Sequence, residues 1–184
     1  MNKQVLAIIG ESAAGKETVV QYIKKKLNNK IKIIKFSDSL TEALSIFLKD
    51  IKREDQQWLI NGLRRRFGQD ILSKAVEKKL EKIKKGVIVL DGIRVFAEEE
   101  MIKRQKGKII YVVAPMKVRW QRVIRRNEKK DDSASFEKFK EMHKSPSELE
   151  IPIIGQRADF KIDNSGNVES LYKQVDKMIK DLKL

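Results

Sequence analysis

The segment that most constrains the fold of this chain is Gly10-Glu11-Ser12-Ala13-Ala14-Gly15-Lys16. It fits the pattern G-x-x-x-x-G-K and follows Val5–Ile9, a continuous apolar run typical of a strand buried on both faces. Apolar residues then recur at the spacing of a helix, at Val19, Ile23 and Leu27. A strand, a glycine-containing turn and a helix in this order predict a loop that wraps around phosphate groups.

The residue types in this segment suit the chemistry of phosphate binding. Glycine lets the backbone wrap closely, so that successive N–H groups point inward at phosphate oxygens. The N-terminus of the following helix adds unpaired N–H groups and the positive end of its dipole. Lys16 supplies a mobile positive charge to the β- and γ-phosphates, where negative charge is shared during phosphoryl transfer. We expect the donor nucleotide to be bound by Gly10, Ser12, Ala13, Ala14, Gly15, Lys16, Glu17 and Thr18.

A second motif places a carboxylate at the end of another predicted strand. Val87–Leu90 is a short apolar run that ends in Asp91 and Gly92. Ligands of open α/β sheets bind at the carboxyl ends of the strands, and a carboxylate there can hold Mg²⁺. Asp91 and Thr18 are therefore the expected Mg²⁺ ligands. Arg94 is expected to offer paired hydrogen bonds to a phosphate.

Polar residues also follow the predicted edge strand Ile31–Phe36. Asp38 is expected to accept a proton from an acceptor hydroxyl, or to hold that hydroxyl or a sugar. The alternative is that Ser37, Asp38 or Ser39 caps the following helix. The sequence leaves both interpretations open.

The helical segment beyond this strand ends in three consecutive arginines, Arg64, Arg65 and Arg66. One of them is expected to contact a phosphate, whereas the others form a solvated basic face. Trp58 and Phe67 are expected to pack within this segment rather than to stack on a base.

A further basic helix is predicted over Met116–Asn127, with arginines at 119, 122, 125 and 126. It leads into the polar, charged stretch Glu128–Pro146, in which one short helix is predicted over Phe136–His143. We expect this region to be a lid that closes over the site. Its arginines, Arg122 and Arg126 foremost, would stabilise charge on the phosphoryl group and exclude water.

The remaining pattern alternates strands and helices. Lys108–Ala114 is a further buried strand and Asp159–Asp163 is a partly polar one that suits a sheet edge. A helix, or a turn followed by a helix, is predicted over Ser37–Asp50. Other helices are predicted over Glu54–Arg66, Asp70–Lys85, Phe96–Lys106 and around Leu171–Leu182. Strands separated by helices indicate a parallel α/β sheet with right-handed crossovers, within one domain over residues 1–184.

Composition excludes several classes of protein. The 184 residues contain no Cys and a single His, which excludes disulfide frameworks, zinc knuckles, thiol catalysis and His-rich metal sites. No apolar run approaches the roughly 18 residues that span a bilayer, and no signal peptide precedes the first strand, so we expect no membrane association and a cytoplasmic protein. The net charge of +15 suggests anionic ligands, although lysine is spread along the whole chain and a purely compositional origin stays open.

Five segments, in order, resemble P-loop kinases of the nucleoside or deoxynucleoside monophosphate kinase and dephospho-CoA kinase type: GESAAGKET, FSDSLTEAL, VLDGIR, VVAPMKVRWQRVIRR and ADFKIDNSGN. They cover nearly the whole chain. The resemblance implies a P-loop NTPase three-layer sandwich with sheet order 2-3-1-4-5. It also implies an acceptor-binding region near residues 37–84, a lid near residues 117–150, and a donor adenine flanked by Arg157, Asn164 and Gly166.

The resemblance and the motifs together predict an ATP-dependent kinase that uses Mg²⁺ and acts on a small nucleotide-type acceptor, foremost a (deoxy)nucleoside monophosphate. Dephospho-CoA kinase is the alternative, with Asp38 as the base toward a ribose hydroxyl. Nucleic-acid binding, phosphorylation of nucleic-acid ends and a regulatory nucleotide switch are further alternatives. Catalytic roles are assigned to Lys16, Asp38, Asp91, Arg94, Arg122 and Arg126.

Overall fold

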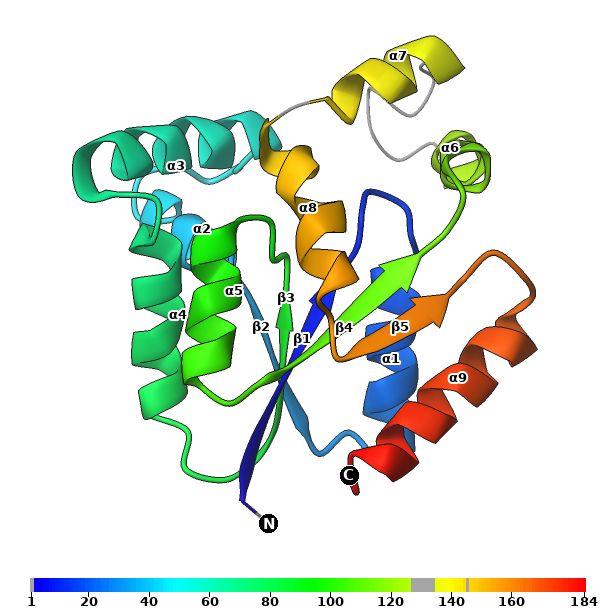
Figure 1. The fold of residues 1–184 in the computed structure, drawn as a ribbon. Helices are drawn as coiled ribbons and strands as arrows, with labels where there is room; N and C mark the ends of the chain where they lie inside the picture. The colour runs from blue at the N-terminus through cyan, green and yellow to red at the C-terminus, as the bar shows by residue number, and fades with distance from the viewer. Residues whose placement is uncertain (1, 127–134, 145) are drawn as a thin grey trace.

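The computed structural model describes residues 2–126, 135–144 and 146–184. Its centre is a five-stranded sheet, entirely parallel, in the order β2-β3-β1-β4-β5 (Figure 1). The strands are β1 (Lys3–Ile9), β2 (Ile31–Lys35), β3 (Gly86–Asp91), β4 (Lys108–Val113) and β5 (Phe160–Asp163). The predicted sheet order is confirmed, and both strands expected at the edges lie there.

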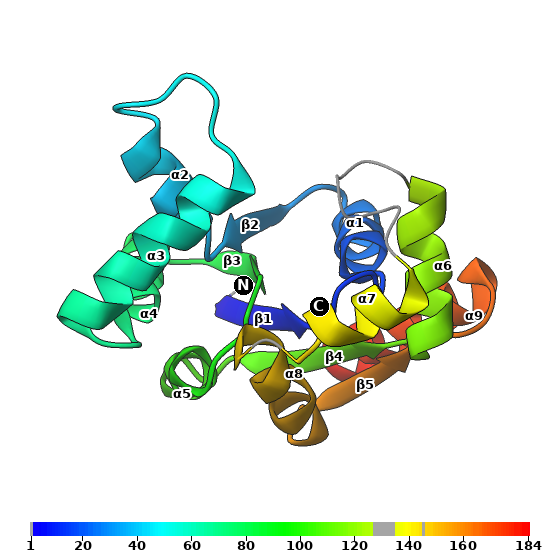
Figure 2. The ribbon, with the colours of Figure 1, turned by 90° about the horizontal axis from the view of Figure 1, so that it is seen from above.

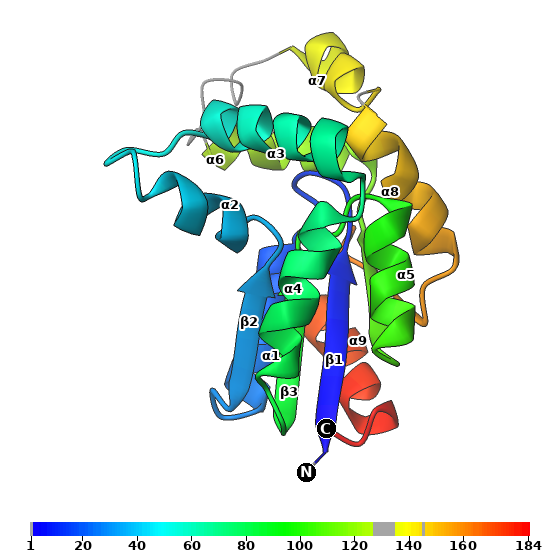
Figure 3. The same cartoon turned by 90° about the vertical axis from the view of Figure 1, so that its left-hand side faces the viewer.

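Helices cover both faces of the sheet, as the three-layer sandwich predicts. One face packs against α1 (Lys16–Lys26) and α9 (Val168–Asp181), and the other against α4 (Ile71–Glu81), α5 (Phe96–Arg104) and α8 (Pro146–Gln156) (Figures 1 and 3). The alternation of side chains along a strand explains the two cores: in β1, Leu6 and Ile8 join the α1 side, whereas Ala7 and Ile9 join the α5 side. All four side chains are buried, because the central strand has helices on both sides.

The remaining helices lie beyond the carboxyl ends of the strands (Figures 1 and 2). They are α2 (Asp38–Leu44), α3 (Arg53–Phe67), α6 (Met116–Arg126) and α7 (Phe136–Met142). Of the segment Ser37–Asp50, expected as a helix or as a turn followed by a helix, only the first half is helical. The helix α2 ends at Leu44, and a loop with exposed Ile46 and Phe47 follows. Of the expected lid, residues 127–134 and 145 lie outside the described residues.

The sequence prediction contained no helix between Pro146 and Asp159, where the structure has α8. The helix begins at Pro146, which suits a first helical position because proline lacks only an N–H that would be unpaired there. Ile151 and Ile154 are buried against β4 and α5, and this burial stabilises a helix that also contains Pro152. The helix thus depends on tertiary packing more than on its own sequence.

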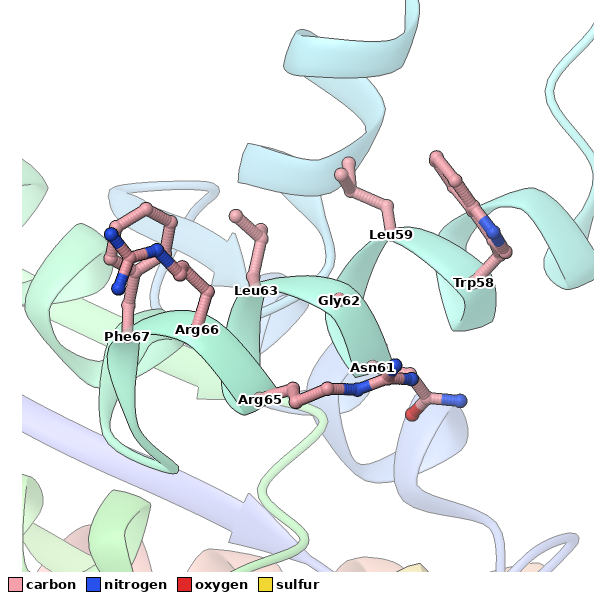
Figure 4. Close-up of a pocket in the computed structure, with 8 residues that line it drawn as sticks. All are labelled: Trp58, Leu59, Asn61, Gly62, Leu63, Arg65, Arg66 and Phe67. Carbon is pink, nitrogen blue, oxygen red and sulfur yellow. The ribbon is translucent and has the colours of Figure 1, made fainter.

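The expected packing of Trp58 and Phe67 within the α2–α3 region is wrong. Their exposed fractions are 74% and 56%, and both line a shallow cavity of about 600 Å³ along α3 (Figure 4). Ile60 and Leu63 contact the core instead, since they occupy the inward face of the helix. Within the described part of the chain, none of the helices is both long and apolar enough to cross a membrane.

Candidate functional site

The loop between β1 and α1 has the backbone shape of a phosphate-binding turn. Ala13 and Gly15 adopt the left-handed conformation, with φ of 59° and 97°. Such residues turn consecutive amides toward one concave side. In the described structure, the amides of Gly15, Lys16 and Glu17 donate no hydrogen bond to another protein group. The loop and the first turn of α1 therefore present free donors at the carboxyl end of the central strand.

The carbonyl groups of the same loop are held from outside by three distant side chains. Asn164 Nδ2 donates to the carbonyl oxygen of Ala14 at 2.8 Å, and Arg122 Nη1 lies 3.4 Å from the same oxygen. Arg119 Nη1 donates to the carbonyl oxygen of Ser12 at 3.3 Å. Because these bonds fix the carbonyls on one side of the loop, they help to keep the amides on the other.

Two glycines of the motif are required by close approach. A Cβ atom on Gly10 would lie 2.4 Å from the carbonyl oxygen of Val112, and one on Gly15 would lie 2.0 Å from Asn164 Nδ2. Gly10 therefore lets β1 and β4 meet below the loop. Gly15 lets Asn164 reach the carbonyl oxygen of Ala14, and its φ of +97° also favours glycine.

A cavity of about 250 Å³ opens beside the loop. The sequence-predicted donor residues Gly15, Thr18, Asn164 and Gly166 line it, together with Arg122. Arg122 Nη2 donates to the carbonyl oxygen of Asn164 at 2.7 Å, so this arginine joins the loop after β5 to the loop before α1. The structure thus brings both predicted donor segments together, although they lie about 150 residues apart.

Lys16 lies inside the loop. Its Nζ donates to the carbonyl oxygens of Gly10 and Glu11, at 2.7 and 3.2 Å. Burial lowers the pKa of the Lys16 ammonium, while the carboxylates of Asp91 and Glu148 act in the opposite direction. The Lys16 ammonium is therefore a desolvated charge. Its two hydrogen bonds to the loop carbonyls can be exchanged for hydrogen bonds to a phosphate.

Asp91 ends β3 next to this lysine. Its Oδ1 atom is buried and, in the described structure, has no hydrogen-bond partner. A buried carboxylate oxygen without a partner fits Mg²⁺, which needs only one or two carboxylates when water and phosphate complete its shell. Thr18, the other predicted ligand, is exposed and lines the cavity beside Asn164. No group of three or more His, Asp or Glu side chains that could hold a metal occurs in the described segments.

Arg94 is not free. Its Nη1 is paired with Oε1 of Glu148 in the first turn of α8. The Arg94 amide donates to Glu98 Oε2 at 2.6 Å, and Glu98 Oε1 lies 3.4 Å from Arg64 Nη2. Glu98 is 1% exposed, and burial raises its pKa against the effect of these donors. This network joins β3, α3, α5 and α8 around the loop after Asp91.

Of the residues expected on the acceptor side, some are bonded within the protein and others are exposed. Asp38 Oδ2 accepts from the backbone amide of Lys35 at 2.8 Å, which ties the start of α2 to the end of β2. The capping interpretation is wrong for Ser37, because it occupies the N-cap position without a side-chain cap bond. Of the three arginines of α3, Arg64 meets Glu98, while Arg65 and Arg66 are exposed and line the cavity in Figure 4.

Three of the four arginines of the expected lid, Arg119, Arg122 and Arg126, interact with the protein, whereas Arg125 is exposed. Arg119 is 3% exposed, and its Nη1 lies 2.6 Å from His143 Nε2. His143 Nδ1 lies 2.8 Å from the carbonyl oxygen of Phe139, so Nδ1 carries the hydrogen and Nε2 accepts from Arg119. These contacts dock α7 onto α6. Arg126, at the last turn of α6, is exposed and also has an interaction partner.

Arg157 does not lie with Asn164 and Gly166. Its guanidinium bonds Glu99 of α5 at 2.5 Å and lies over the Phe96 ring, 5.2 Å from the centroid. This position between α8 and α5 is on the opposite face of the sheet from α1 and α9. Arg157 follows α8, which packs on the same face of the sheet as α5, and it precedes β5. It therefore does not flank the same place as Asn164 and Gly166, as the resemblance implies.

Three acidic residues of the site were missed by sequence reasoning: Glu11, Glu98 and Glu148. Glu11 Oε2 accepts from the Tyr111 hydroxyl at 3.1 Å, and burial together with this carboxylate raises the pKa of Tyr111. For Glu148 a local signal exists, since a proline followed two residues later by a glutamate is typical of a helix N-terminus. Neither Glu11 nor Glu98 has a comparable signal.

Comparison with known families supports this geometry. Residues 6–143 match the family described as AAA domain. The chain belongs to this AAA domain family. The matched range begins in β1 and includes the loop between β1 and α1, Asp91, and the helices α6 and α7.

The chain is also similar to archaeal proteins. It is 27% identical over 180 residues to the "UPF0200/UPF0201 protein" of Archaeoglobus fulgidus, covering 95% of this chain but only 54% of that protein. The same identity holds over 178 residues with a UPF0200 protein of Saccharolobus solfataricus, covering 95% of this chain and 92% of the relative. The chain thus spans about half of the first relative and nearly all of the second.

Solved structures show the same fold at low identity. Shikimate kinase from Bacteroides thetaiotaomicron has a TM-score of 0.66 at 15% identity, covering 98% of this chain and 99% of that one. TT1252 from Thermus thermophilus has a TM-score of 0.61 at 17% identity, covering 99% of both chains. Dephospho-CoA kinase from Campylobacter jejuni has a TM-score of 0.50 at 19% identity, covering 98% and 97%. The chain therefore has a P-loop kinase-like fold.

Proposed function

We propose that the protein is an ATP-dependent phosphotransferase that moves the γ-phosphoryl group of ATP onto a small-molecule acceptor of nucleotide type. The observation that carries the proposal is the loop at Gly15, with free amides on one side and carbonyls anchored by Asn164 and Arg122 on the other. Lys16 lies inside this loop, and a cavity for a base opens beside it. The P-loop kinase-like fold supports the donor, since this fold implies ATP binding.

In this proposal the loop amides bind the β- and γ-phosphates, and the base of ATP lies in the cavity at Asn164 and Gly166. Lys16 exchanges its bonds to the carbonyls of Gly10 and Glu11 for phosphate oxygens. Since phosphoryl transfer depends mainly on positioning and charge neutralisation, a desolvated lysine in a rigid loop supplies much of what the reaction needs.

Mg²⁺ would be held by Asp91, directly or through water, and it supplies positive charge to the β- and γ-phosphate oxygens. The unpartnered Oδ1 of Asp91 supports this role. Residues 37–84 are proposed as the acceptor side, because α2 and α3 lie over the carboxyl edge of the sheet (Figure 3).

The test is ADP formation with a panel of acceptors, together with ATP binding by calorimetry. Nucleoside monophosphates and dephospho-CoA are the two acceptor classes favoured by the resemblance, and both belong in the panel. We expect the protein to bind ATP and to form ADP only when a suitable acceptor is present. If ATP fails to bind to the wild-type protein, the proposal is wrong.

A further inference from the structure

Two of the arginines that lie toward the acceptor side of the site are already paired inside the protein. Arg94 is paired with Glu148, and Arg64 lies 3.4 Å from Glu98. Both glutamates are buried, with exposed fractions of 9% and 1%. Each guanidinium therefore has a buried carboxylate that compensates its charge, although Arg64 Nε has no hydrogen-bond partner among the described residues.

Acceptor atoms at the same place are not satisfied. Glu148 Oε2 and Asp91 Oδ1 are buried and, within the described residues, have no hydrogen-bond partner. Asp91 ends β3 beside β1, which leads into the loop at Gly10, and Arg94, three residues farther along, is paired with Glu148. Both carboxylates therefore lie at the carboxyl edge of the sheet, where the γ-phosphate would be. Buried carboxylate oxygens normally have a partner, and the proposed function assigns Mg²⁺ to Asp91 Oδ1. Glu148 Oε2 is the atom that indicates a ligand with a proton donor.

The two classes of acceptor make opposite demands on such a site. A phosphate acceptor brings about two negative charges beside the γ-phosphate and needs unpaired cations. Taking Arg94 away from Glu148 to supply one would leave a buried carboxylate uncompensated, which is strongly unfavourable. A hydroxyl acceptor brings no charge and donates one hydrogen bond, which is what Glu148 Oε2 lacks.

Resting on the proposed function, we infer that the group phosphorylated by this protein is a hydroxyl rather than a phosphate, and that Glu148 is the catalytic base that accepts its proton. The hydroxyl oxygen forms the new bond to the γ-phosphorus as the bond from that phosphorus to the β,γ-bridging oxygen breaks. The proton passes to Glu148 Oε2 and then to water, ADP leaves, and the product is a phosphate monoester. Asp38, the base expected from sequence, instead holds the Lys35 amide.

The first experiment identifies the product. Wild-type protein is incubated with ATP and Mg²⁺ and, separately, with nucleosides, nucleoside monophosphates and dephospho-CoA, and products are distinguished by ³¹P NMR as monoesters or anhydrides. We expect monoesters only, including from any nucleoside monophosphate that reacts. Formation of a nucleoside diphosphate, or ATP binding without turnover of any hydroxyl compound, would overturn the inference. Loss of ATP binding would instead contradict the proposed function.

The second experiment tests Glu148 itself. Glu148→Gln keeps an oxygen for Arg94 but cannot accept a proton, so kcat is expected to fall about 100-fold or more. The KM for ATP should be unchanged, and the acidic limb of the pH profile of kcat should disappear. Glu150→Gln, two residues along α8, is the matched control; its carboxylate accepts from the Phe96 amide, and the amide side chain retains an acceptor oxygen.

Thermal unfolding of both variants separates chemistry from folding. A Glu148→Gln protein that is folded and binds ATP but keeps wild-type kcat would show that Glu148 is not the base. If Glu148→Gln does not fold, Glu148→Asp is used, and partial kcat with an altered pH profile is expected. Full activity of the aspartate variant with an unaltered profile would contradict the assignment.

Discussion

Lys16 illustrates at the residue scale how a charge can oppose stability and yet be needed for binding. Its pKa is lowered by burial, so the folded state binds fewer protons than the unfolded state between the lowered pKa and 10.5. The free energy of unfolding from this residue therefore rises with pH across that window. Below the window both states are protonated, and the full cost of burying the charge is present.

Lys16→Met removes this charge while keeping an unbranched chain. We expect the free energy of unfolding at pH 7 to stay within about 1 kcal/mol of wild type or to increase. Its rise with pH should be smaller than in wild type up to 10.5, and phosphoryl transfer should be lost. Urea unfolding between pH 7 and 10, with ADP formation as the activity assay, measures all three. A large loss of stability would indicate a structural lysine.

Gly15 is the residue at which backbone shape and close approach coincide. Gly15→Ala would place Cβ 2.0 Å from Asn164 Nδ2 at a φ of +97°. We expect a loss of about 2 to 4 kcal/mol from strain and from the displaced Asn164 hydrogen bond. Gly166→Ala is the control, since its Cβ would meet no atom within 4 Å. Equal stability of the two variants in urea titrations would contradict this account.

At the scale of elements, α6 holds the loop before α1 through Arg119 and Arg122 rather than through its exposed basic surface. Arg122 bonds the carbonyl oxygens of Ala14 and Asn164, whereas Arg125 in the same helix is exposed. Arg122→Ala is expected to weaken ATP binding about 10- to 100-fold, because two anchors of the loop are lost, each a hydrogen bond from a charged group. Arg125→Ala should bind ATP as wild type does. Calorimetric titration of both variants decides between them.

The docking of α8 on β4 depends on a glycine that the helix presents to an aromatic ring. Gly155→Ala would bring Cβ to 2.5 Å from Tyr111. Although alanine favours helix, we expect a net loss of about 1 to 3 kcal/mol from overpacking. Gly62→Ala in α3, with no atom within 4 Å of its Cβ, should instead stabilise by up to about 1 kcal/mol. The difference between the two helical glycines is read from their thermal midpoints.

The whole molecule gathers its site from segments that lie far apart in the chain. Four segments meet at the carboxyl edge of the sheet: the loop before α1, the end of β3, the first turn of α8 and the loop after β5 (Figure 1).

A ligand that binds at this edge should therefore stabilise the entire fold. ATP at 100 times its Kd is expected to add about 2.7 kcal/mol to the free energy of unfolding. At about 2 to 4 °C per kcal/mol, the thermal midpoint should rise by about 5 to 11 °C. An unchanged midpoint at saturating ATP would contradict binding at this site.

Sequence reasoning found the elements whose signals are local. The apolar runs at Val5–Ile9 and Val87–Leu90, with the spacing around Lys16, are patterns within a few residues of each other. They sufficed for the parallel sheet and the loop. They did not suffice for Trp58, whose ring is exposed because the outward face of α3 has no neighbouring element among the described residues.

The sequence by itself determined the strand–loop–helix unit and the set of polar residues at strand ends. Apolar spacing and glycine positions suffice for these features, because they set the conformation of the backbone next to them. Tertiary structure alone decided which of those residues are free and which are paired. Asn164 reaches Ala14 across 150 positions, and Glu148 reaches Arg94 across 54. Such contacts depend on where the folded chain places two distant segments, and no local pattern encodes that distance. For this reason the sequence predicts that Arg94 binds a phosphate, whereas in the folded protein Arg94 is paired with the buried carboxylate of Glu148.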